Sequence, residues 1–600
     1  MNAMILRRPP ARAAAGSPLL LAALLLAAGP GLSQELKVEE TTLGNGMKLL
    51  VLPRRDEPTI ACGWVARVGS ANERPGITGI SHLFEHMMFK GTPTIGLKDP
   101  AKDLAKDLAL IDEQEKVRSA MREEISKMRA AQRRGELDDL TKPENKTARY
   151  KELEKQFDEL VKAQRDLLVK NEFDKIYTAQ GASGMNAFTT EDMTGYWVNV
   201  PKNKLELWMW LESDRLKNPV FREFYAERDV VYEERRRSVE STPTGKLEEA
   251  FGEIFWHSSP YAWPAIGYPS DLVAITKQQA DDYYALYYAP NNITAILVGD
   301  FDPAGARDLA ERYFGRIPRG KNPPPEVITA PPKWDAEVRV TGEAETNPEV
   351  EIRWHTVPFE HKDSYALQIL AGLLNGRTGR LDKALVLPAG AVATKASASA
   401  GGLMTPQKYA GEFTIDAEAK EGKSLAEVEK GALAEVEKLK SDLVPAEELQ
   451  KVKNNVAAAS FRRLSSNFFI LMQLMVYEGY GDWREMNEGP KKAAAVTAED
   501  VRRVARTYLA ADNRAELFVS RKGGAAAEDP EIAALPEAMR PMVKQSLARI
   551  AAMTDPEALK KMIDQMEVRA GQAPPEMKKG VDLILARARA RLDELSKGKK

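Results

Sequence analysis

Residues 79–92 of the 600-residue chain read Gly-Ile-Ser-His-Leu-Phe-Glu-His-Met-Met-Phe-Lys-Gly-Thr, and they bring together several side chains that could bind a metal ion. The chain has five histidines, and His82 and His86 stand four positions apart here, with Glu85 between them. On a helix, positions i, i+3 and i+4 share one face. The two imidazoles can therefore bind one metal ion with the glutamate beside it. An HxxEH arrangement is typical of zinc sites in which the glutamate polarises a water molecule.

The alternative interpretation is a helix that carries two core histidines, but histidine is rare enough in this chain to favour a metal site. The pattern Gly-x-x-His-x-x-Glu-His-Met-x-Phe-x-Gly-Thr resembles the signature of the pitrilysin/insulinase family of zinc metallopeptidases, which includes mitochondrial processing peptidase and many bacterial members. The resemblance covers roughly two-thirds of the chain. It implies a bacterial two-domain zinc metallopeptidase with one Zn²⁺ per chain.

A helix expected over residues 221–239 supplies the third metal ligand. Phe224 and Val230 recur there at helical spacing, and Glu227 and Glu234 fall on the same apolar face. A carboxylate on such a face is costly unless it is paired or bound to metal. The segment ending at Glu234, Glu-Arg-x-Val-Val-x-Glu-Glu, also resembles the family motif whose last glutamate is the ligand. We expect Glu234 to bind the metal and Glu227 to orient a ligand; the alternative is surface ion pairs with the following arginines.

An internal repeat divides the chain into two halves. Residues 274–300 and 495–519 both read as a threonine-capped helix, an asparagine-containing turn and a strand at one constant offset. We predict an α+β fold with two homologous α/β domains in tandem, at 37–318 and 335–522, each with a mixed or antiparallel sheet packed with helices. The proline-rich stretch at 319–334 joins them.

The second copy carries no HxxEH, since residues 365–374 have only apolar spacing, so we expect it to serve packing and substrate enclosure. Residues 376–381 resemble a family turn, Gly-x-Ser-Ser-Arg-Leu-Tyr, whose arginine helps to hold substrate. Arg380 matches that arginine, but Asp382 stands where a tyrosine is usual. Arg380 is therefore either a substrate contact or one half of a structural ion pair.

Residues 183–200 are rich in β-branched and aromatic residues and predict a strand, a turn and a strand. The pattern that begins at Asn186 and Ala187 is similar to the family's edge strand beside the zinc, to which substrate adds as an extra strand. This resemblance implies that Asn186 and Ala187 bind substrate. The alternative is an ordinary edge hairpin.

Two segments lie outside the resemblance. Residues 98–178 are charged and carry helical spacing, which predicts an antiparallel, coiled-coil-like helical hairpin inserted into the first domain. It is either a solvated insertion, which we favour, or a lid or partner-docking arm. Residues 528–600 are rich in alanine, methionine and charge, and predict a helical C-terminal extension.

The N-terminus carries the pattern of an export signal. Three arginines precede an apolar stretch at residues 19–28, which is too short to span a membrane, and small residues follow near Ser33. We expect a signal peptide at 1–33, no stable membrane span after its cleavage, and a periplasmic or secreted protein. The alternative is an uncleaved anchor. Cys62 is the only cysteine, so no intrachain disulfide is possible, and a net charge of −2 gives no indication of nucleic acid binding.

The expected function is that of a zinc-dependent endopeptidase that hydrolyses peptides or unfolded segments in an enclosed chamber. Glu85 would take a proton from a zinc-bound water and return it to the leaving amine. Family chambers are built from four such domains and this chain has two, which implies a homodimer or a heterodimer with a homologous subunit. The alternative function is that of a non-catalytic or catalytic subunit of a hetero-oligomeric peptidase complex.

Overall fold

The structure, a computed structural model, describes residues 35–597 apart from 141, 322, 402–406, 523–531, 533–534, 537–538, 552, 554 and 571–574. The expected signal peptide at 1–33 therefore lies outside the described residues. Within the described part of the chain, no helix combines the length and apolar content needed to cross a membrane. Contacts divide the chain into two compact units, one reaching Gly342 and resuming over Pro348–Val519, the other comprising Glu343–Asn347 and Ser520–Lys600.

The first half of the larger unit is built on a six-stranded sheet with the order β1-β2-β6-β3-β5-β4. Its strands are β1 (Glu39–Thr42), β2 (Lys48–Pro53), β3 (Thr59–Ala66), β4 (Ser183–Thr189), β5 (Thr194–Pro201) and β6 (Ile293–Gly299). β2 and β6 are parallel and the other pairs are antiparallel, so the sheet is mixed. β6 is buried along its whole length, and β4 is an edge strand.

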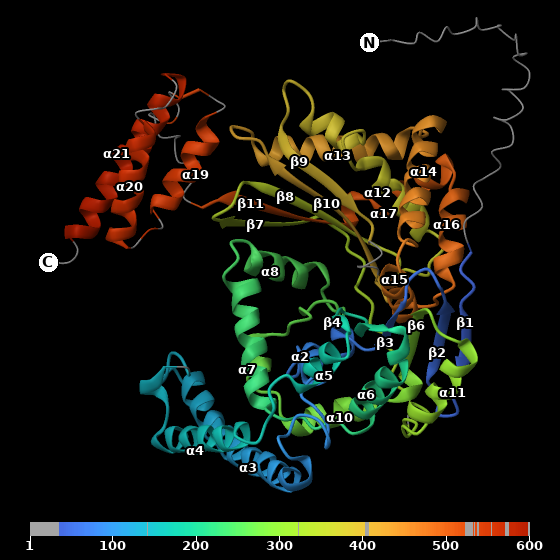
Figure 1. The fold of residues 1–600 in the computed structure, drawn as a ribbon. Coiled ribbons are helices and arrows are strands. Elements are labelled where there is room, and N and C mark those ends of the chain that lie inside the picture. The colour runs from blue at the N-terminus through green and yellow to red at the C-terminus, as the bar shows by residue number, and fades with distance from the viewer. Residues whose placement is uncertain are drawn as a thin grey trace, which may run out of the picture. The chain divides into compact units, whose positions relative to one another are not determined.

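Helices pack on this sheet around a large aromatic core (Figure 1). They are α2 (Ile80–Met87), α6 (Leu205–Lys217), α7 (Phe224–Arg235), α8 (Gly245–Phe255), α9 (Pro269–Leu272), α10 (Lys277–Tyr287) and α11 (Pro303–Tyr313). Trp64 of β3 stacks on Tyr196 of β5 at 4.1 Å between ring centroids. Tyr196 also donates a hydrogen bond to the carbonyl of Phe84 in α2, 3.0 Å away, which ties the HxxEH helix to the sheet.

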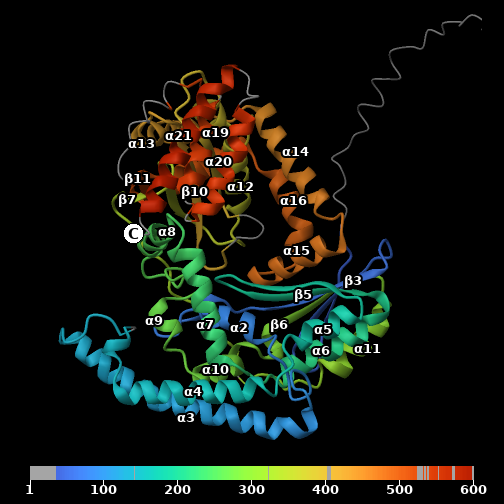
Figure 2. The ribbon, with the colours of Figure 1, turned by 60° about the vertical axis from the view of Figure 1, so that its left-hand side comes forward.

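The segment expected to be a helical hairpin forms α3 (Pro100–Arg133), α4 (Ala148–Arg165) and α5 (Glu172–Ala179), with α3 and α4 in extended contact (Figure 2). Its base is fixed to the rest of the first half by a fully buried ion pair, in which Nε of Arg222 donates to Oδ2 of Asp107 at 2.7 Å. Nε2 of Gln164 donates to the other oxygen of Asp107 at 2.9 Å. The hairpin is therefore anchored directly before α7.

The second half repeats the same sheet topology with one strand fewer, in the order β7-β11-β8-β10-β9. Its strands are β7 (Val338–Ala344), β8 (Glu349–Thr356), β9 (Ala393–Ser399), β10 (Gly411–Ala419) and β11 (Arg514–Arg521). Its helices are α12 (Ser364–Leu374), α13 (Leu425–Ser441), α14 (Ala446–Arg462), α15 (Asn467–Tyr480), α16 (Glu485–Ala495) and α17 (Ala498–Tyr508).

The repeat read from the sequence has matching hydrogen bonds in the two halves. Thr276 and Thr497 each form a capping box at the start of α10 and α17. The side-chain amide of Asn292 donates to the carbonyl of Tyr287, and that of Asn513 donates to the carbonyl of Tyr508. Each amide also reaches a carbonyl at the end of a neighbouring strand. The α+β fold with two homologous halves is thus confirmed.

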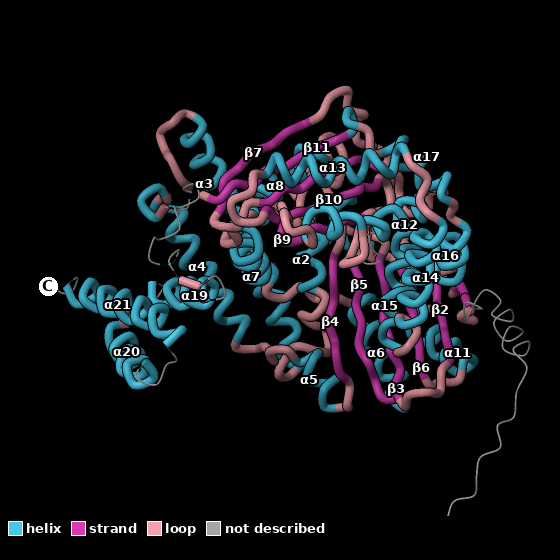
Figure 3. Tube along the Cα trace, turned by 90° about the horizontal axis from the view of Figure 1, so that it is seen from above, coloured by secondary structure: helices cyan, strands magenta, loops and turns pink. Residues whose placement is uncertain are grey.

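A helix of the second half covers the open face of the first-half sheet. α15 lies across β3 and β6, where its apolar residues share one core with the sheet (Figure 3). The buried carboxylate of Glu478 on α15 pairs with Arg67 and Lys48 of the first half. The two halves therefore form a single packed body.

The smaller unit has its own apolar core. It contains α19 (Arg540–Ala551), α20 (Pro556–Ala570) and α21 (Pro575–Lys597). Val543, Leu559 and Ile584 are buried in that core. The C-terminal extension is thus helical in its described residues.

Candidate metal centre

The HxxEH helix α2 depends on a carboxylate from outside the helix for its N-terminal cap. Gly79 at the N-cap adopts φ 89° and has no side chain to accept a hydrogen bond. The two oxygens of Glu73 instead accept from the backbone N–H groups of Gly79 and Ser81, at 2.7 and 2.8 Å. Burial raises the pKa of Glu73 to about 8. A side chain at position 79 would meet the carbonyl oxygen of Ile266 at 2.6 Å, so glycine is required there.

The structure brings His82, His86 and Glu234 together, with one ligand atom of each within 4.8 Å of the others. Oε2 of Glu234 lies 3.8 Å from Nε2 of His82 and 3.4 Å from Nε2 of His86. Tetrahedral zinc with bonds of about 2.0–2.1 Å sets neighbouring ligand atoms about 3.3 Å apart. Two imidazole nitrogens and one carboxylate at these separations fit zinc, and they leave a coordination position for water or substrate.

The protonation state of His82 also suits a metal. Burial lowers the pKa of His82 to about 4, and the neighbouring His86 adds to the effect, so this imidazole is neutral and its nitrogen is available as a ligand. Its Nδ1 is buried with no hydrogen-bond partner among the described residues.

Glu227 fixes the orientation of His86. Its Oε1 accepts from Nδ1 of His86 at 2.9 Å, which leaves Nε2 directed at the metal position. The ammonium of Lys90 lies 2.5 Å from Oε2 of Glu227. Burial alone would raise the pKa of Glu227, but His86 and Lys90 outweigh it and lower the pKa to about 2. Burial lowers the pKa of His86, but the bond to Glu227 outweighs it and the net shift is upward.

The apolar face assigned to Glu234 of α7 was wrong. The residues of α7 that are buried are Phe224, Tyr225, Arg228, Val231 and Arg235. Val230 is 50% exposed, and the side chain of Glu234 is 47% exposed. Glu234 thus borders an open site, whereas the side chain of Glu227, one heptad earlier, is only 12% exposed. Glu234 is near the histidines because α7 packs beside α2, not because a buried carboxylate demands a partner.

Glu85 lies beside this triad and is held by the edge strand. Thr189, the last residue of β4, donates from Oγ1 to Oε2 of Glu85 at 2.7 Å. Burial raises the pKa of Glu85, and the hydrogen bond from Thr189 partly offsets the rise. Thr189 was not predicted as a site residue, although it belongs to the strand pattern that drew attention to Asn186. Asn186 is exposed on β4, and Ala187 is buried.

Arg380, His355 and His257 do not belong to this cluster. Arg380 donates from Nε and Nη2 to the carboxylate of Glu448, at 2.9 and 2.8 Å, so it forms a two-point ion pair within the second half. His355 stacks on Phe255 at 4.1 Å and contacts that residue's carbonyl through Nε2 at 2.8 Å. His257 is exposed. None of them belongs to the metal-binding group found among the described residues.

Two family models match the chain. The model described as insulinase (peptidase family M16) matches residues 50–111, which include the whole HxxEH motif. The model described as peptidase M16 inactive domain matches residues 274–456. The first match covers α2. The second match begins after α7 and extends into the second half, which has no HxxEH motif.

Relatives of this chain are named zinc proteases. The zinc protease PqqE of Helicobacter pylori is 25% identical over 487 residues, which are 79% of this chain and 90% of that protein. The probable zinc protease PqqL of Escherichia coli is 24% identical over 50% of this chain and 25% of its own length.

Solved structures show the same fold. A protease from Helicobacter pylori matches with a TM-score of 0.64 and 23% identity, over 81% of this chain and 99% of that one. The periplasmic protease PqqL from Escherichia coli matches with a TM-score of 0.58 and 15% identity, over 82% of this chain and 48% of that one. Residues 50–111 and 274–456 thus match peptidase M16 (insulinase) domains, and these matches together with the relatives named zinc proteases support a zinc metallopeptidase with a two-domain fold.

Proposed function

We propose that the chain is an endopeptidase in which His82, His86 and Glu234 hold one zinc ion and Glu85 moves the protons of peptide hydrolysis. The observation that carries this proposal is the convergence of three ligand atoms within 4.8 Å, directly beside a carboxylate that binds none of them. A zinc ion at this position supplies Lewis acidity toward a water molecule and the scissile carbonyl.

The protein groups around the metal position have separable tasks. Glu85 accepts the proton of the attacking water and delivers it to the leaving amine. Thr189 holds the Glu85 carboxylate in place from β4. Glu227 and Lys90 keep His86 in the orientation that presents Nε2. Burial of Glu85 suits its task, because a raised pKa lets a carboxyl group both take up and release a proton near neutral pH.

Extended peptides or unfolded segments are the proposed substrates. The outer edge of β4 has no strand partner among the described residues, and the strand ends at Thr189, which contacts Glu85. A substrate that adds to this edge as an antiparallel or parallel strand would pass Asn186 and Ala187 and bring a peptide bond beside the metal. Only a chain free of its own secondary structure can pair in this way.

We also propose that the chain works as a dimer, with itself or with a homologous subunit, so that four domains enclose the substrate. Export to the periplasm or the exterior is proposed from the expected signal at 1–33. The Escherichia coli relative described as a periplasmic protease supports it.

The substitution Glu85→Gln tests the mechanism. It keeps the size of the side chain and a hydrogen-bond acceptor for Thr189 but removes the base. We expect the zinc content to stay at one per chain while cleavage of an unfolded test protein falls at least about 10³-fold. Gln368→Ala, on the matching helix of the second half, is the control. Cleavage by a zinc-loaded Glu85→Gln protein at the wild-type rate would refute the assignment.

A further inference from the structure

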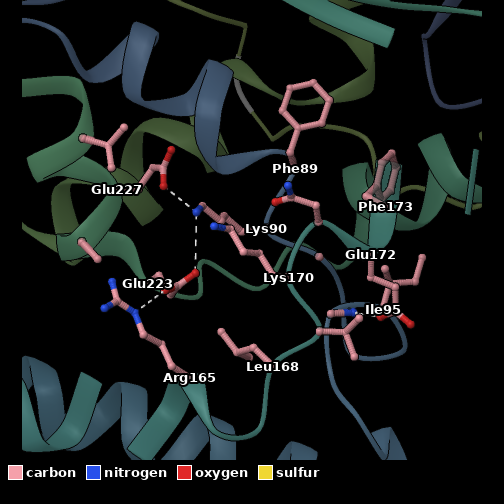
Figure 4. Close-up of a pocket in the computed structure, with 16 residues that line it drawn as sticks. Phe89, Lys90, Ile95, Arg165, Leu168, Lys170, Glu172, Phe173, Glu223 and Glu227 are labelled. Atoms are coloured by element: carbon pink, nitrogen blue, oxygen red, sulfur yellow. Dashed lines mark hydrogen bonds and ion pairs between the residues drawn. The ribbon is translucent and has the colours of Figure 1, made fainter. Parts of the chain in front are cut away.

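A cavity of about 550 Å³ lies next to the metal centre, and the proposed mechanism gives it no task. Three segments line it: residues 89–96 after α2, residues 165–173 at the exit of the helical hairpin, and residues 223–230 at the start of α7. Figure 4 shows Lys90 and Lys170 extending toward the same region of this pocket, with Arg165 paired with Glu223 at its edge. The hairpin insertion therefore supplies one wall of a site beside the catalytic helix.

The carboxylates of the pocket are already engaged by protein donors. Glu227 binds His86 and Lys90. Glu223 accepts from Nε of Arg165 at 2.9 Å and lies 3.7 Å from the ammonium of Lys90. Glu172 accepts from the backbone N–H of Gly96. Each carboxylate of the pocket therefore already accepts at least one hydrogen bond or ion pair from the protein.

Two cationic side chains of the pocket have donor atoms that no described protein group uses. The ammonium of Lys170 has no hydrogen bond or ion pair with any other residue that the structure describes. Arg165 uses Nε for Glu223, and no bond joins its two terminal nitrogens to the described chain. Spare donors of positive charge call for a carboxylate or a similar anion. Phe89, Phe173 and Val230 form an apolar part of the wall, which suits a ligand that also has an apolar body.

The position of the pocket relates it to the metal. Val230 and Glu227 lie on α7, and Glu223 is its N-cap residue; all three precede Glu234 in the chain and line the pocket. At about 1.5 Å per residue, Glu227 and Glu223 stand about 10 and 16 Å from Glu234 along the helix. An extended peptide spans that length in about three to five residues.

We propose that this pocket is a substrate subsite for a carboxylate, which lies about three to five residues from the scissile bond and is bound by Lys170 and Arg165. The carboxylate belongs either to an acidic side chain or to the end of the peptide. This inference rests on the proposed peptidase function, and it names the class of peptide that the site prefers.

The experiment uses the full-length, zinc-loaded protein and peptides of one neutral sequence. Glu replaces Gln at each position in turn, and each peptide is made with a free or an amidated carboxyl terminus. We expect kcat/KM to be about five- to tenfold higher for a carboxylate at the favoured distance. If peptides with Glu are preferred over those with Gln, the subsite binds an acidic side chain. If peptides with a free carboxyl terminus are preferred over amidated ones, it binds the end of the chain.

The variant Lys170→Glu sharpens the test by reversing the charge. We expect the ratio of kcat/KM for the Glu peptide over the Gln peptide to fall below one, and a Lys peptide to become the better substrate. Lys175→Glu, exposed on α5 and outside the pocket, is the matched control and should keep the wild-type ratio. Equal ratios in the wild-type and Lys170→Glu proteins would overturn the proposal.

Binding separates this proposal from the peptidase function itself. Anisotropy of labelled peptides on zinc-loaded Glu85→Gln protein reports the subsite without turnover. A carboxylate preference that Lys170→Glu reverses supports the subsite, even where no peptide is cleaved by the wild-type protein. Loss of cleavage for all peptides would refute the proposed function alone, and equal binding of Glu and Gln peptides would refute the subsite alone.

Discussion

Helices α2 and α12 occupy corresponding places in the two halves of the chain, because each follows the strand that lies third from the end of its sheet, β3 and β8. Nine of the eleven residues of α12 are buried, and the helix is enclosed by α14, α16 and α17. Five of the eight residues of α2 are buried, and its open face looks toward α7 and β4. The two halves therefore share one scaffold, but only α2 has an uncovered face on which reactive side chains can be placed.

The largest expected contrast is between a histidine of each half. His86→Ala removes a proposed metal ligand and should lower cleavage more than about 10³-fold, with little effect on folding. His355→Ala removes a ring that packs on Phe255 and should lower the free energy of unfolding by about 2 kcal/mol, with cleavage by the folded protein retained. Activity assays and denaturant titrations on both variants check this, and equal losses of activity would break the contrast.

The junction of the two halves should make stability depend on pH. Asp192, in the loop between β4 and β5, accepts from the hydroxyl of Tyr261 at 2.8 Å and from the backbone N–H of Lys408 in the second half at 3.0 Å. Burial raises the pKa of Asp192 from 3.8 to about 7. The native state therefore binds this proton more tightly than the unfolded state does. The stabilisation is present below pH 4 and is lost as the pH rises through 7, by up to about 4 kcal/mol.

Asp192→Asn tests this junction, because an amide still accepts from Tyr261 but does not ionise. Its free energy of unfolding should lose that decline between pH 4 and pH 7, while the wild-type protein retains it. Denaturant titrations at several pH values measure the difference. An unchanged slope in the variant would show that another group carries the dependence.

A smaller effect is expected from the carboxylate behind His86. Glu227→Gln keeps a hydrogen-bond acceptor but removes the charge that orients the imidazole, so zinc affinity should fall about 10- to 100-fold. Glu448→Gln, which removes the carboxylate paired with Arg380 in the second half, is the control and should leave zinc affinity unchanged. Competition with a chelator measures both, and equal affinities would remove Glu227 from the metal centre.

The smallest effect should be the same in both halves. Thr276→Ala and Thr497→Ala each remove an N-cap, and each should cost about 1 kcal/mol of stability. Thermal unfolding of the two variants gives the comparison. A cost confined to one half would indicate that the repeated caps have diverged in their contribution.

The metal centre was predictable from sequence where its residues are local. His82, Glu85 and His86 share one face of one helix, so spacing alone places them together. Glu234 was placed beside the histidines by its resemblance to the family motif and by the periodicity of α7, and the second argument was wrong because the structure exposes the side chain. Periodicity shows which residues share a face but not what that face meets.

Contacts between distant segments could not be read from the sequence. Thr189 reaches Glu85 across 104 positions, because the insertion of α3–α5 separates the two elements. The ammonium of Lys170, which no described protein group binds, lines the pocket because the end of the hairpin returns to the start of α7. Glu73 lies only six residues before Gly79 and could have been found, because a glycine N-cap leaves helix N–H groups in need of an outside acceptor.

The most direct test of the account is the zinc content of the purified full-length protein and of Glu234→Ala, measured by plasma mass spectrometry after dialysis. Because only one of the two homologous halves carries the HxxEH helix, we expect one zinc per wild-type chain. In Glu234→Ala, which lacks the third ligand, we expect a zinc content near zero. Two zinc ions per chain, or one ion that persists in Glu234→Ala, would contradict a single centre formed by α2 and α7.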